Sequence, residues 1–285
     1  MKKDLAAQIE SEIHNLSKSK KKIALTILSD YDKIAYMTAA KLSKMVGVSE
    51  STVVRFAIDL GYDGYPEFQH AVQELVRAKL TPNQRIRISE ERLGGANPIE
   101  NVMTSDSEKI KYTMHSIDRA AFAAAVDAIV SAENVYIFGV RSSAFLAGFF
   151  NYNLSMIQDN VRLIQPTSSS EVFEQILGIS KRDVLIAISF PRYSAKIINA
   201  LKYARARDAI VIALTDSVQS PLAEHANYLL TAQSDMASFV DSLVAPLSII
   251  DALLVAVTQR RGNEVRERFD RLERVWDEYD VYTKT

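Results

Sequence analysis

The sequence predicts two domains of different fold class. The first is an all-α N-terminal domain built around a helix-turn-helix, and the second is a three-layer α/β domain with a five-stranded parallel sheet between two layers of helices. Apolar residues recur at helical spacing on both sides of Gly47 in "KLSKMVGVSESTVVRFAIDLGY", residues 41–62. From residue 134 onward, short apolar runs alternate with helical patterns, which is typical of a parallel sheet covered on both faces.

Gly47 divides the first stretch into two helices. Before it, Ala40, Leu42 and Val46 can share one face of a short helix. Glycine suits the left-handed conformation that ends a helix, and Ser49 is a natural N-cap for the helix that follows. Along this second helix the apolar residues again return at helical spacing, and they are Val53, Phe56, Ala57 and Leu60.

The opposite face of the second helix is short, polar and rich in hydroxyl groups, which suits contacts to phosphate. Two helices joined by a short turn with glycine can place the second helix in a major groove, where an arginine can contact a phosphate or a guanine edge. Two alternatives stay open: a helical hairpin with a solvated face, and a salt bridge from Arg55 to Asp59. The candidate DNA-contacting residues are Ser49, Glu50, Ser51, Thr52, Val54 and Arg55.

The sequence around this unit resembles a known family. The phrase "MTAAKLSKMVGVSESTVVRFAIDLGYDGYPEFQHAV", residues 37–72, is similar to the N-terminal helix-turn-helix of the RpiR/MurR family of bacterial transcriptional regulators. The resemblance rests on a small-residue helix, then GVS, a TV-x-RF helix and LGY-x-G-x-x-EF. It implies that the chain binds a double-stranded DNA operator.

Composition limits the other function classes. The formal net charge is only -1, but residues 1–80 carry 12 Lys and Arg against 10 acids, and DNA binding needs only local positive potential. The absence of cysteine excludes disulfide scaffolds and cysteine metal or redox sites. The N-terminus lacks an apolar signal core and no apolar run has membrane-spanning length, so we expect a cytoplasmic protein without a membrane partner.

The first domain is expected to end near residue 80. Apolar spacing in "FQHAVQELVRAKL", residues 68–80, predicts one more helix. The polar stretch that follows contains Gly94, Gly95 and Pro98 and predicts a linker, with room for a short helix. A helical pattern then follows in "SEKIKYTMHSI", residues 107–117. The expected division is therefore a helix-turn-helix domain at 1–80, a linker at 81–110 and a second domain at 111–285.

Five apolar runs predict the strands of the second domain. Each is followed by a helical pattern, and the last precedes a long helix from about residue 239 to 260. Sheets of this kind bind ligands at the carboxyl ends of their strands, where helix N-termini present free amides to anions. The predicted strands are residues 134–139, 161–164, 183–189, 209–215 and 228–232.

Two loops at predicted strand ends carry hydroxyl groups and an arginine. They are "FGVRSS", residues 138–143, and "ISFPRYS", residues 188–194, and each lies at the start of a predicted helix. The simplest structural role for their serines is N-capping, which Ser142 and Ser194 can provide. Two similar loops after neighbouring strands favour an anion-binding site instead.

The stretch from about 118 to 258 resembles the SIS, or sugar isomerase, domain, which forms the C-terminal half of RpiR/MurR regulators and binds phosphosugars. The family loops G-x-G-x-S and S-x-S-G-x-T correspond to residues 139–143 and 189–194, so Arg141 and Arg192 stand where the family has glycine. These arginines can bind an anion, or they can pair with acids and close the pocket. The effector-binding residues implied are Arg141, Ser142, Ser143, Ser189, Arg192, Tyr193 and Ser194.

These observations lead to one expected function and two alternatives. We expect a ligand-responsive, DNA-binding transcriptional regulator of sugar or amino-sugar metabolism, a homodimer or homotetramer, with a phosphorylated sugar or similar small anion as effector. In the first alternative the SIS-like domain only oligomerises, and in the second it is a sugar-phosphate isomerase, for which Glu171, Glu174 and His225 are the acid/base candidates. No metal-ligand spacing is present. We therefore expect no enzyme activity, no cofactor and no metal.

Overall fold

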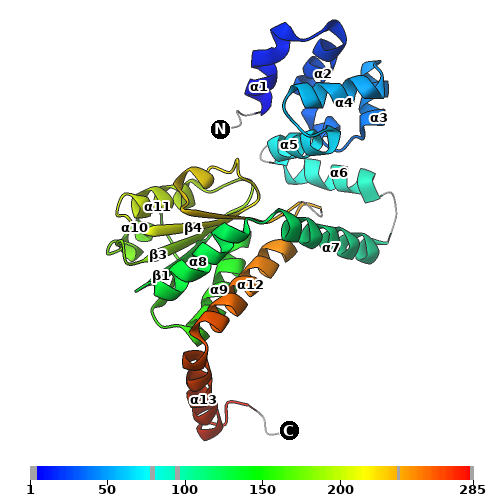
Figure 1. The fold of residues 1–285 in the computed structure, drawn as a ribbon. Helices are drawn as coiled ribbons and strands as arrows, with labels where there is room; N and C mark the ends of the chain where they lie inside the picture. Colours follow the sequence, from blue (N-terminus) through cyan, green and yellow to red (C-terminus); the bar gives the residue numbers. More distant parts are fainter. Residues whose placement is uncertain (1–4, 78–80, 94–96, 236–237, 283–285) are drawn as a thin grey trace. The chain divides into compact units, whose positions relative to one another are not determined.

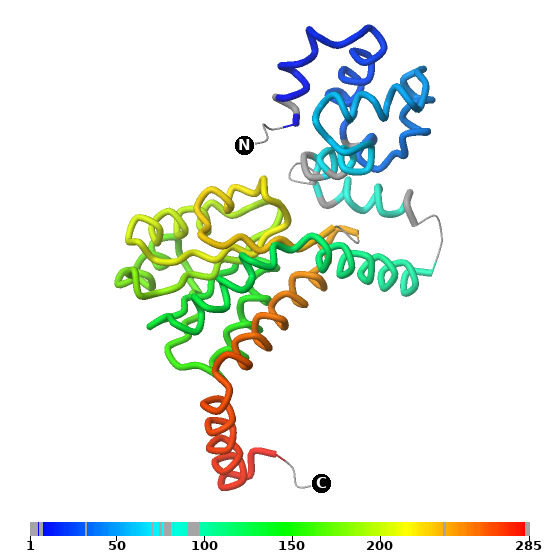
Figure 2. Tube along the Cα trace, in the orientation of Figure 1, coloured from blue at the N-terminus to red at the C-terminus, as the bar shows by residue number. Residues whose placement is uncertain are grey.

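The computed structural model describes residues 5–77, 81–93, 97–235 and 238–282. The chain forms two compact units, Met1–Arg87 and Ile88–Thr285. Figures 1 and 2 show the path of the chain through both units.

The first unit is entirely helical in its described part. Its elements are α1 (Leu5–Glu12), a 3-10 turn η1 (Ile13–Asn15), α2 (Lys18–Ile34), α3 (Ala39–Val46), α4 (Glu50–Asp59) and α5 (Tyr65–Arg77), and α6 (Pro82–Leu93) crosses into the second unit. The core includes Ile23, Ile27, Leu42, Phe56 and Phe68, all fully buried. The predicted all-α domain with two helices around Gly47 is confirmed.

The second unit is a three-layer α/β domain. Its elements are α7 (Pro98–Ser116), α8 (Arg119–Ser131), β1 (Val135–Gly139), α9 (Ser142–Ile157), β2 (Val161–Ile164), α10 (Ser170–Gln175), β3 (Val184–Ile188), α11 (Ala195–Arg205), β4 (Ile210–Thr215), η2 (Ala223–His225), β5 (Tyr228–Thr231), α12 (Val244–Arg261) and α13 (Asn263–Glu278). All neighbouring strands are parallel, in the order β2-β1-β3-β4-β5. The predicted fold class is confirmed.

Helices cover both faces of the sheet (Figure 1), and alternate residues of β1 and β3 pack with opposite helix layers. In β1, Val135 and Ile137 pack with α8, α9 and α12, whereas Tyr136 and Phe138 pack with α10 and α11. The strand β3 alternates in the same way. Because both of their faces are covered, β1 and β3 are buried along their whole length, which is why they appear in the sequence as continuous apolar runs.

Two expectations differ from the structure. The stretch 81–110 was expected to be a polar linker, but α6 and α7 occupy most of it, with residues 94–96 outside the described ranges. The Asn97 side chain accepts a hydrogen bond from the amide of Ile99 at 3.0 Å, and Pro98 takes the first helical position. The last long helix begins at Val244 rather than near residue 239, because a proline such as Pro246 fits only the first turn of a helix. The domain limits of 1–80 and 111–285 stay a prediction.

Candidate functional site

The turn between α3 and α4 is held by local hydrogen bonds. Thr38 caps α3 by accepting from the amide of Lys41 at 3.3 Å. Gly47 has a φ of 73°, and the amides of Gly47 and Val48 both donate to the carbonyl of Ser43, at 2.9 and 3.0 Å. Glycine adopts this left-handed conformation without a steric penalty, so the helix ends where the sequence predicts.

Ser49 caps the N-terminus of α4, as expected. Its hydroxyl accepts from the amide of Thr52 at 3.2 Å. It also lies 2.9 Å from the hydroxyl of Ser51 and 2.7 Å from that of Thr52. The first turn of α4 therefore presents three hydroxyl groups and the positive end of the helix dipole together, a combination that suits phosphate.

The opposite face of α4 fixes its orientation. Val53, Phe56 and Ala57 are fully buried, and the ring of Phe56 meets that of Phe68 edge to face, with ring centroids 5.7 Å apart. The residues that remain accessible form one face of α4, which we call the recognition face. Ser49, Glu50, Ser51 and Arg55 are exposed on it, and Thr52 and Val54 are half-buried.

Arg55 and Asp59 do not form the salt bridge considered from the sequence. Asp59 pairs instead with Lys20, on α2. Within the described ranges, Arg55 takes part in no ion pair. Its guanidinium is therefore available to an external partner.

The strand order places the second candidate site. In the sheet, β2 pairs with one edge of β1, and β3 pairs with the opposite edge of β1, so the strand order reverses at β1. Crevices form at such a switch point, outside the carboxyl ends of the strands. Gly139 at the end of β1 is paired with Ile188 at the end of β3. The two loops considered from the sequence therefore start side by side, and we call this region the ligand edge.

Both arginines of the ligand edge hold glycine-like backbone conformations. The φ angle is 57° at Arg141 and 66° at Arg192. A left-handed conformation costs a residue with a side chain about 1–2 kcal/mol. The backbone thus keeps the conformation that glycine would favour, although the guanidinium side chains occupy these positions. Both side chains are exposed, and neither forms an ion pair with any residue that the structure describes.

The N-capping role considered for two serines is wrong. Arg141, not Ser142, is the N-cap residue of α9, and no side chain caps that helix. Ser194 is the N-cap residue of α11, but its hydroxyl makes no capping bond. Ser143 and Ser189 are each only 4% exposed. In the described part of the chain none of these four hydroxyl groups has a hydrogen-bond partner, so they are available to a ligand.

A hydrogen-bond chain joins the second loop to the end of β4. The Tyr193 hydroxyl donates to Asp216 at 2.7 Å, and Asp216 also accepts from Thr215 at 3.1 Å. The Thr215 hydroxyl lies 2.9 Å from that of Ser220. Sequence reasoning missed Asp216 and Ser220, although the polar run directly after an apolar strand was a usable signal. Tyr193 is therefore held in place by a hydrogen bond within the protein.

The three acid/base candidates lie on two separate elements, α10 and η2. Glu171, in α10, accepts two hydrogen bonds from the amide and hydroxyl of Thr167, both at 2.6 Å. These bonds lower the pKa of the Glu171 carboxyl below its ordinary value. His225 lies in η2, and Glu174 is exposed on α10. The described residues contain no group of three or more His, Cys, Asp or Glu side chains placed to hold a metal ion. Within the same ranges, no helix combines the length and apolar character of a membrane span.

Two family models match the chain in separate regions. A model described as "Helix-turn-helix domain, rpiR family" matches residues 3–79, and a model of the SIS domain matches residues 128–256. The recognition face lies within the first match and the ligand edge within the second.

Relatives match this chain over nearly all of their own length. The HTH-type transcriptional regulator HexR of Escherichia coli is 29% identical over 94% of this chain and 93% of its own. A solved structure of the Vibrio vulnificus NanR protein, complexed with ManNAc-6P, covers 98% of this chain and 100% of its own, with 22% identity and a TM-score of 0.61. The sugar isomerase domain of an RpiR transcription factor from Sphaerobacter thermophilus covers 61% of this chain and 97% of its own, with 26% identity and a TM-score of 0.58. With an rpiR-type helix-turn-helix followed by a SIS domain, the chain belongs to the RpiR family of transcriptional regulators.

Proposed function

We propose that the recognition face inserts into the major groove of a roughly palindromic operator, with the chain acting as a homodimer or homotetramer. The exposure of this face over a rigidly packed helix supports the proposal. Symmetric assemblies place two recognition helices on half-sites related by two-fold symmetry. The residues proposed to contact DNA are Ser49, Glu50, Ser51, Thr52, Val54 and Arg55.

The guanidinium of Arg55, which forms no ion pair within the described ranges, offers the sharpest test of this proposal. With an operator selected from a random DNA pool, Arg55→Ala should weaken binding by about 1–3 kcal/mol if Arg55 contacts a base edge. Arg205→Ala removes another exposed arginine, in α11 of the second unit, and should leave operator binding unchanged. Equal affinity of Arg55→Ala and the wild type, measured by fluorescence anisotropy, removes Arg55 from the contacts.

We further propose that a phosphorylated sugar binds at the ligand edge and controls operator binding. Three features support an anion there, each judged among the described residues: serine hydroxyls without a hydrogen-bond partner, two arginines without acidic partners, and the uncapped N-termini of α9 and α11. The related NanR protein has been solved with ManNAc-6P, a phosphorylated amino sugar. The residues proposed to contact the effector are Arg141, Ser142, Ser143, Ser189, Arg192, Tyr193 and Ser194.

A thermal-shift screen of sugar phosphates against their unphosphorylated sugars tests the effector class. A phosphorylated compound should raise the unfolding temperature, because ligand that binds only the folded state stabilises it by mass action. The same compound should change the affinity for the selected operator. No shift with any phosphorylated sugar supports the alternative that this domain only oligomerises.

We also propose that the chain is not an isomerase. Isomerisation needs an acid/base group with a pKa near the working pH, whereas hydrogen bonds lower the pKa of Glu171 away from it. Assays on ketose and aldose phosphates should show no conversion above a boiled-protein control. Turnover that disappears in Glu171→Gln or His225→Asn would favour the enzyme alternative.

The proposed function sets the cellular context. A regulator of this kind acts where bacterial DNA is, in the cytoplasm, and a sugar-phosphate effector implies control of genes for sugar or amino-sugar metabolism. Chromatin immunoprecipitation followed by sequencing would identify the controlled genes and test this assignment.

A further inference from the structure

The helix α7 attaches to its own domain by its polar side. Lys109 and Thr113 are buried, with 4% and 5% exposure. The ammonium group of Lys109 lies 3.3 Å from the Asp106 carboxylate, which also accepts a hydrogen bond from Ser242 at 2.6 Å. The Thr113 hydroxyl accepts from the amide of Gln233 at 2.9 Å. These bonds fix which side of α7 faces the domain.

The apolar side of α7 is consequently exposed. Ile99, Met103, Ile110 and Met114 have exposed fractions of 68%, 68%, 37% and 53%. Steps of four and seven residues keep these side chains on one face of a helix. A helix on the surface of a monomer normally has the reverse arrangement, with apolar residues inside and polar residues outside. An exposed apolar stripe next to a buried lysine indicates a partner surface.

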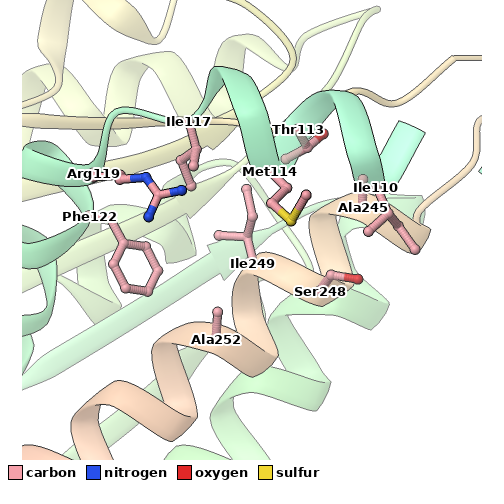
Figure 3. Close-up of a pocket in the computed structure, with 10 residues that line it drawn as sticks. All are labelled: Ile110, Thr113, Met114, Ile117, Arg119, Phe122, Ala245, Ser248, Ile249 and Ala252. Atoms are coloured by element: carbon pink, nitrogen blue, oxygen red, sulfur yellow. The ribbon is translucent and has the colours of Figure 1, made fainter. Parts of the chain in front are cut away.

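The stripe leads into an apolar cavity of about 460 Å³. Its walls come from α7, α8 and α12, and Figure 3 shows Met114, Phe122 and Ile249 around it. Ile110 and Met114 belong to both the stripe and the cavity wall. The N-terminal half of α7 thus carries the most exposed side chains of the stripe, Ile99 and Met103, and the C-terminal half lines the cavity.

We propose that a second copy of this chain covers the stripe, with the α7 helices of the two copies antiparallel. The proposal rests on the proposed function, in which a symmetric pair binds the operator. In a two-fold interface, residue i of one copy contacts residue j of the other copy, and residue j of the first copy contacts residue i of the second. Antiparallel α7 helices would insert the Ile99 and Met103 end of each copy into the cavity of the other.

The charges along α7 are complementary in this arrangement. Glu100 lies in the first turn, whereas Lys111 lies near the other end and Arg119 lines the cavity. Antiparallel packing brings Glu100 toward Lys111 and Arg119 of the other copy, and parallel packing would place like charges together. The helix dipoles also favour the antiparallel arrangement. The two-fold axis then passes near Asp106 and Ser107, with Met103 opposite Ile110 of the other copy.

Sedimentation velocity on the full chain tests whether the α7 stripe is the dimer interface. Wild-type protein should be dimeric or larger at micromolar concentration, and Met103→Glu or Ile110→Glu should weaken dimerisation by roughly 100-fold, because a charge is buried in the apolar centre. Tyr112→Glu changes an exposed ring on another side of α7 and should have no effect. Circular dichroism must first show that the variants are folded. Dimers that persist in both variants overturn the proposal, whereas a monomeric wild type overturns the symmetric pair of the proposed function as well.

Cysteine crosslinking tests the register independently, because the chain contains no cysteine. A disulfide needs Cα atoms within about 7 Å, and seven residues along one helix span about 10 Å, so only two copies can form the bond. The double variant Met103→Cys/Ile110→Cys should give a covalent dimer on oxidation, and neither single variant should. Crosslinking by Met103→Cys alone indicates parallel helices, and no crosslink indicates another occupant, such as the chain's own first unit. Either result overturns the antiparallel pair.

Discussion

The recognition face and the ligand edge are built in opposite ways. Every residue of the recognition face lies on one turn and one helix, and its caps are hydrogen bonds between residues at most five apart, such as Ser49 with Thr52. The ligand edge joins two loops about 50 residues apart, which meet only because β1 pairs with β3. The first site is defined by local sequence and the second by topology.

The two sites also differ in backbone strain. At the turn before the recognition face, glycine takes the left-handed position at Gly47. At the ligand edge, Arg141 and Arg192 take such positions. Strain of this kind persists where the surrounding structure determines the conformation, and it concentrates at binding sites.

The largest expected effect separates the two units. Phe56 is fully buried under α4, so Phe56→Ala should destabilise the first unit by about 3–5 kcal/mol. Hydrogen exchange of the full chain should accelerate in α2 to α5 while the sheet strands stay protected. Ile58→Ala, at an exposed position of the same helix, should change little. Equal acceleration in both units would show that their stabilities are coupled.

A second prediction concerns the close approach at the ligand edge. A Cβ atom at Gly139 would lie 2.3 Å from the backbone oxygen of Ser143, so Gly139→Ala must displace the start of α9. We expect a loss of about 1–3 kcal/mol in the second unit, as for other overpacked sites, and loss of the thermal shift with sugar phosphates. Gly148→Ala is the matched control, because nothing lies within 4 Å of its Cβ position and alanine favours a helix. Wild-type stability in Gly139→Ala would contradict the close approach of Gly139 to the Ser143 backbone.

The recognition face could be predicted from sequence because its determinants are local. Gly47, Ser49 and the apolar spacing of α4 specify the turn, the cap and the buried face without any distant residue. The strands at the ligand edge were predicted from apolar runs alone. The bond from Tyr193 to Asp216 was not, because it joins two loops that only the folded sheet brings together.

The first half of α7, residues 98–106, was assigned to a linker for a different physical reason. Its pattern lacks the usual match between apolar residues and burial, because Lys109 is inside and Met103 is outside. A periodicity argument assumes that one chain covers its own apolar face. Where a partner covers it, a helix of this kind resembles a polar linker.

A third prediction concerns pH and the first unit. Burial raises the pKa of the Tyr65 phenol to about 12 from 10.0, and its hydroxyl donates to the carbonyl of Met37 at 2.7 Å. Between pH 10 and pH 12 the Tyr65 phenol is ionised in the unfolded chain but still protonated in the folded chain. The free energy of unfolding therefore falls as the pH rises from 10 toward 12. This loss should be about 1 kcal/mol by pH 11 and absent in Tyr65→Phe. Denaturant unfolding at pH 9 and 11 checks it, and parallel losses in both proteins would contradict the assignment.

The smallest expected difference tests why arginine occupies the glycine positions of the ligand edge. Arg192→Ala removes the guanidinium but keeps a side chain at a φ of 66°, whereas Arg192→Gly removes both the guanidinium and the strain. Glycine should therefore give the more stable protein of the two, by about 1 kcal/mol in thermal unfolding.

Effector affinity distinguishes the contribution of the Arg192 guanidinium from that of the backbone conformation. Both variants should bind the sugar phosphate found in the screen roughly tenfold or more weakly by calorimetry, because a charge-assisted hydrogen bond contributes about 1.5–3 kcal/mol. Operator affinity without effector should stay at the wild-type level, since Arg192 lies outside the first unit. Wild-type effector affinity in both variants, and in Arg141→Ala, would mean that the arginines only shape the loops and that the serine hydroxyls and helix amides bind the phosphate. Weak binding in the alanine variant alone would mean that the glycine backbone, rather than the charge, decides affinity.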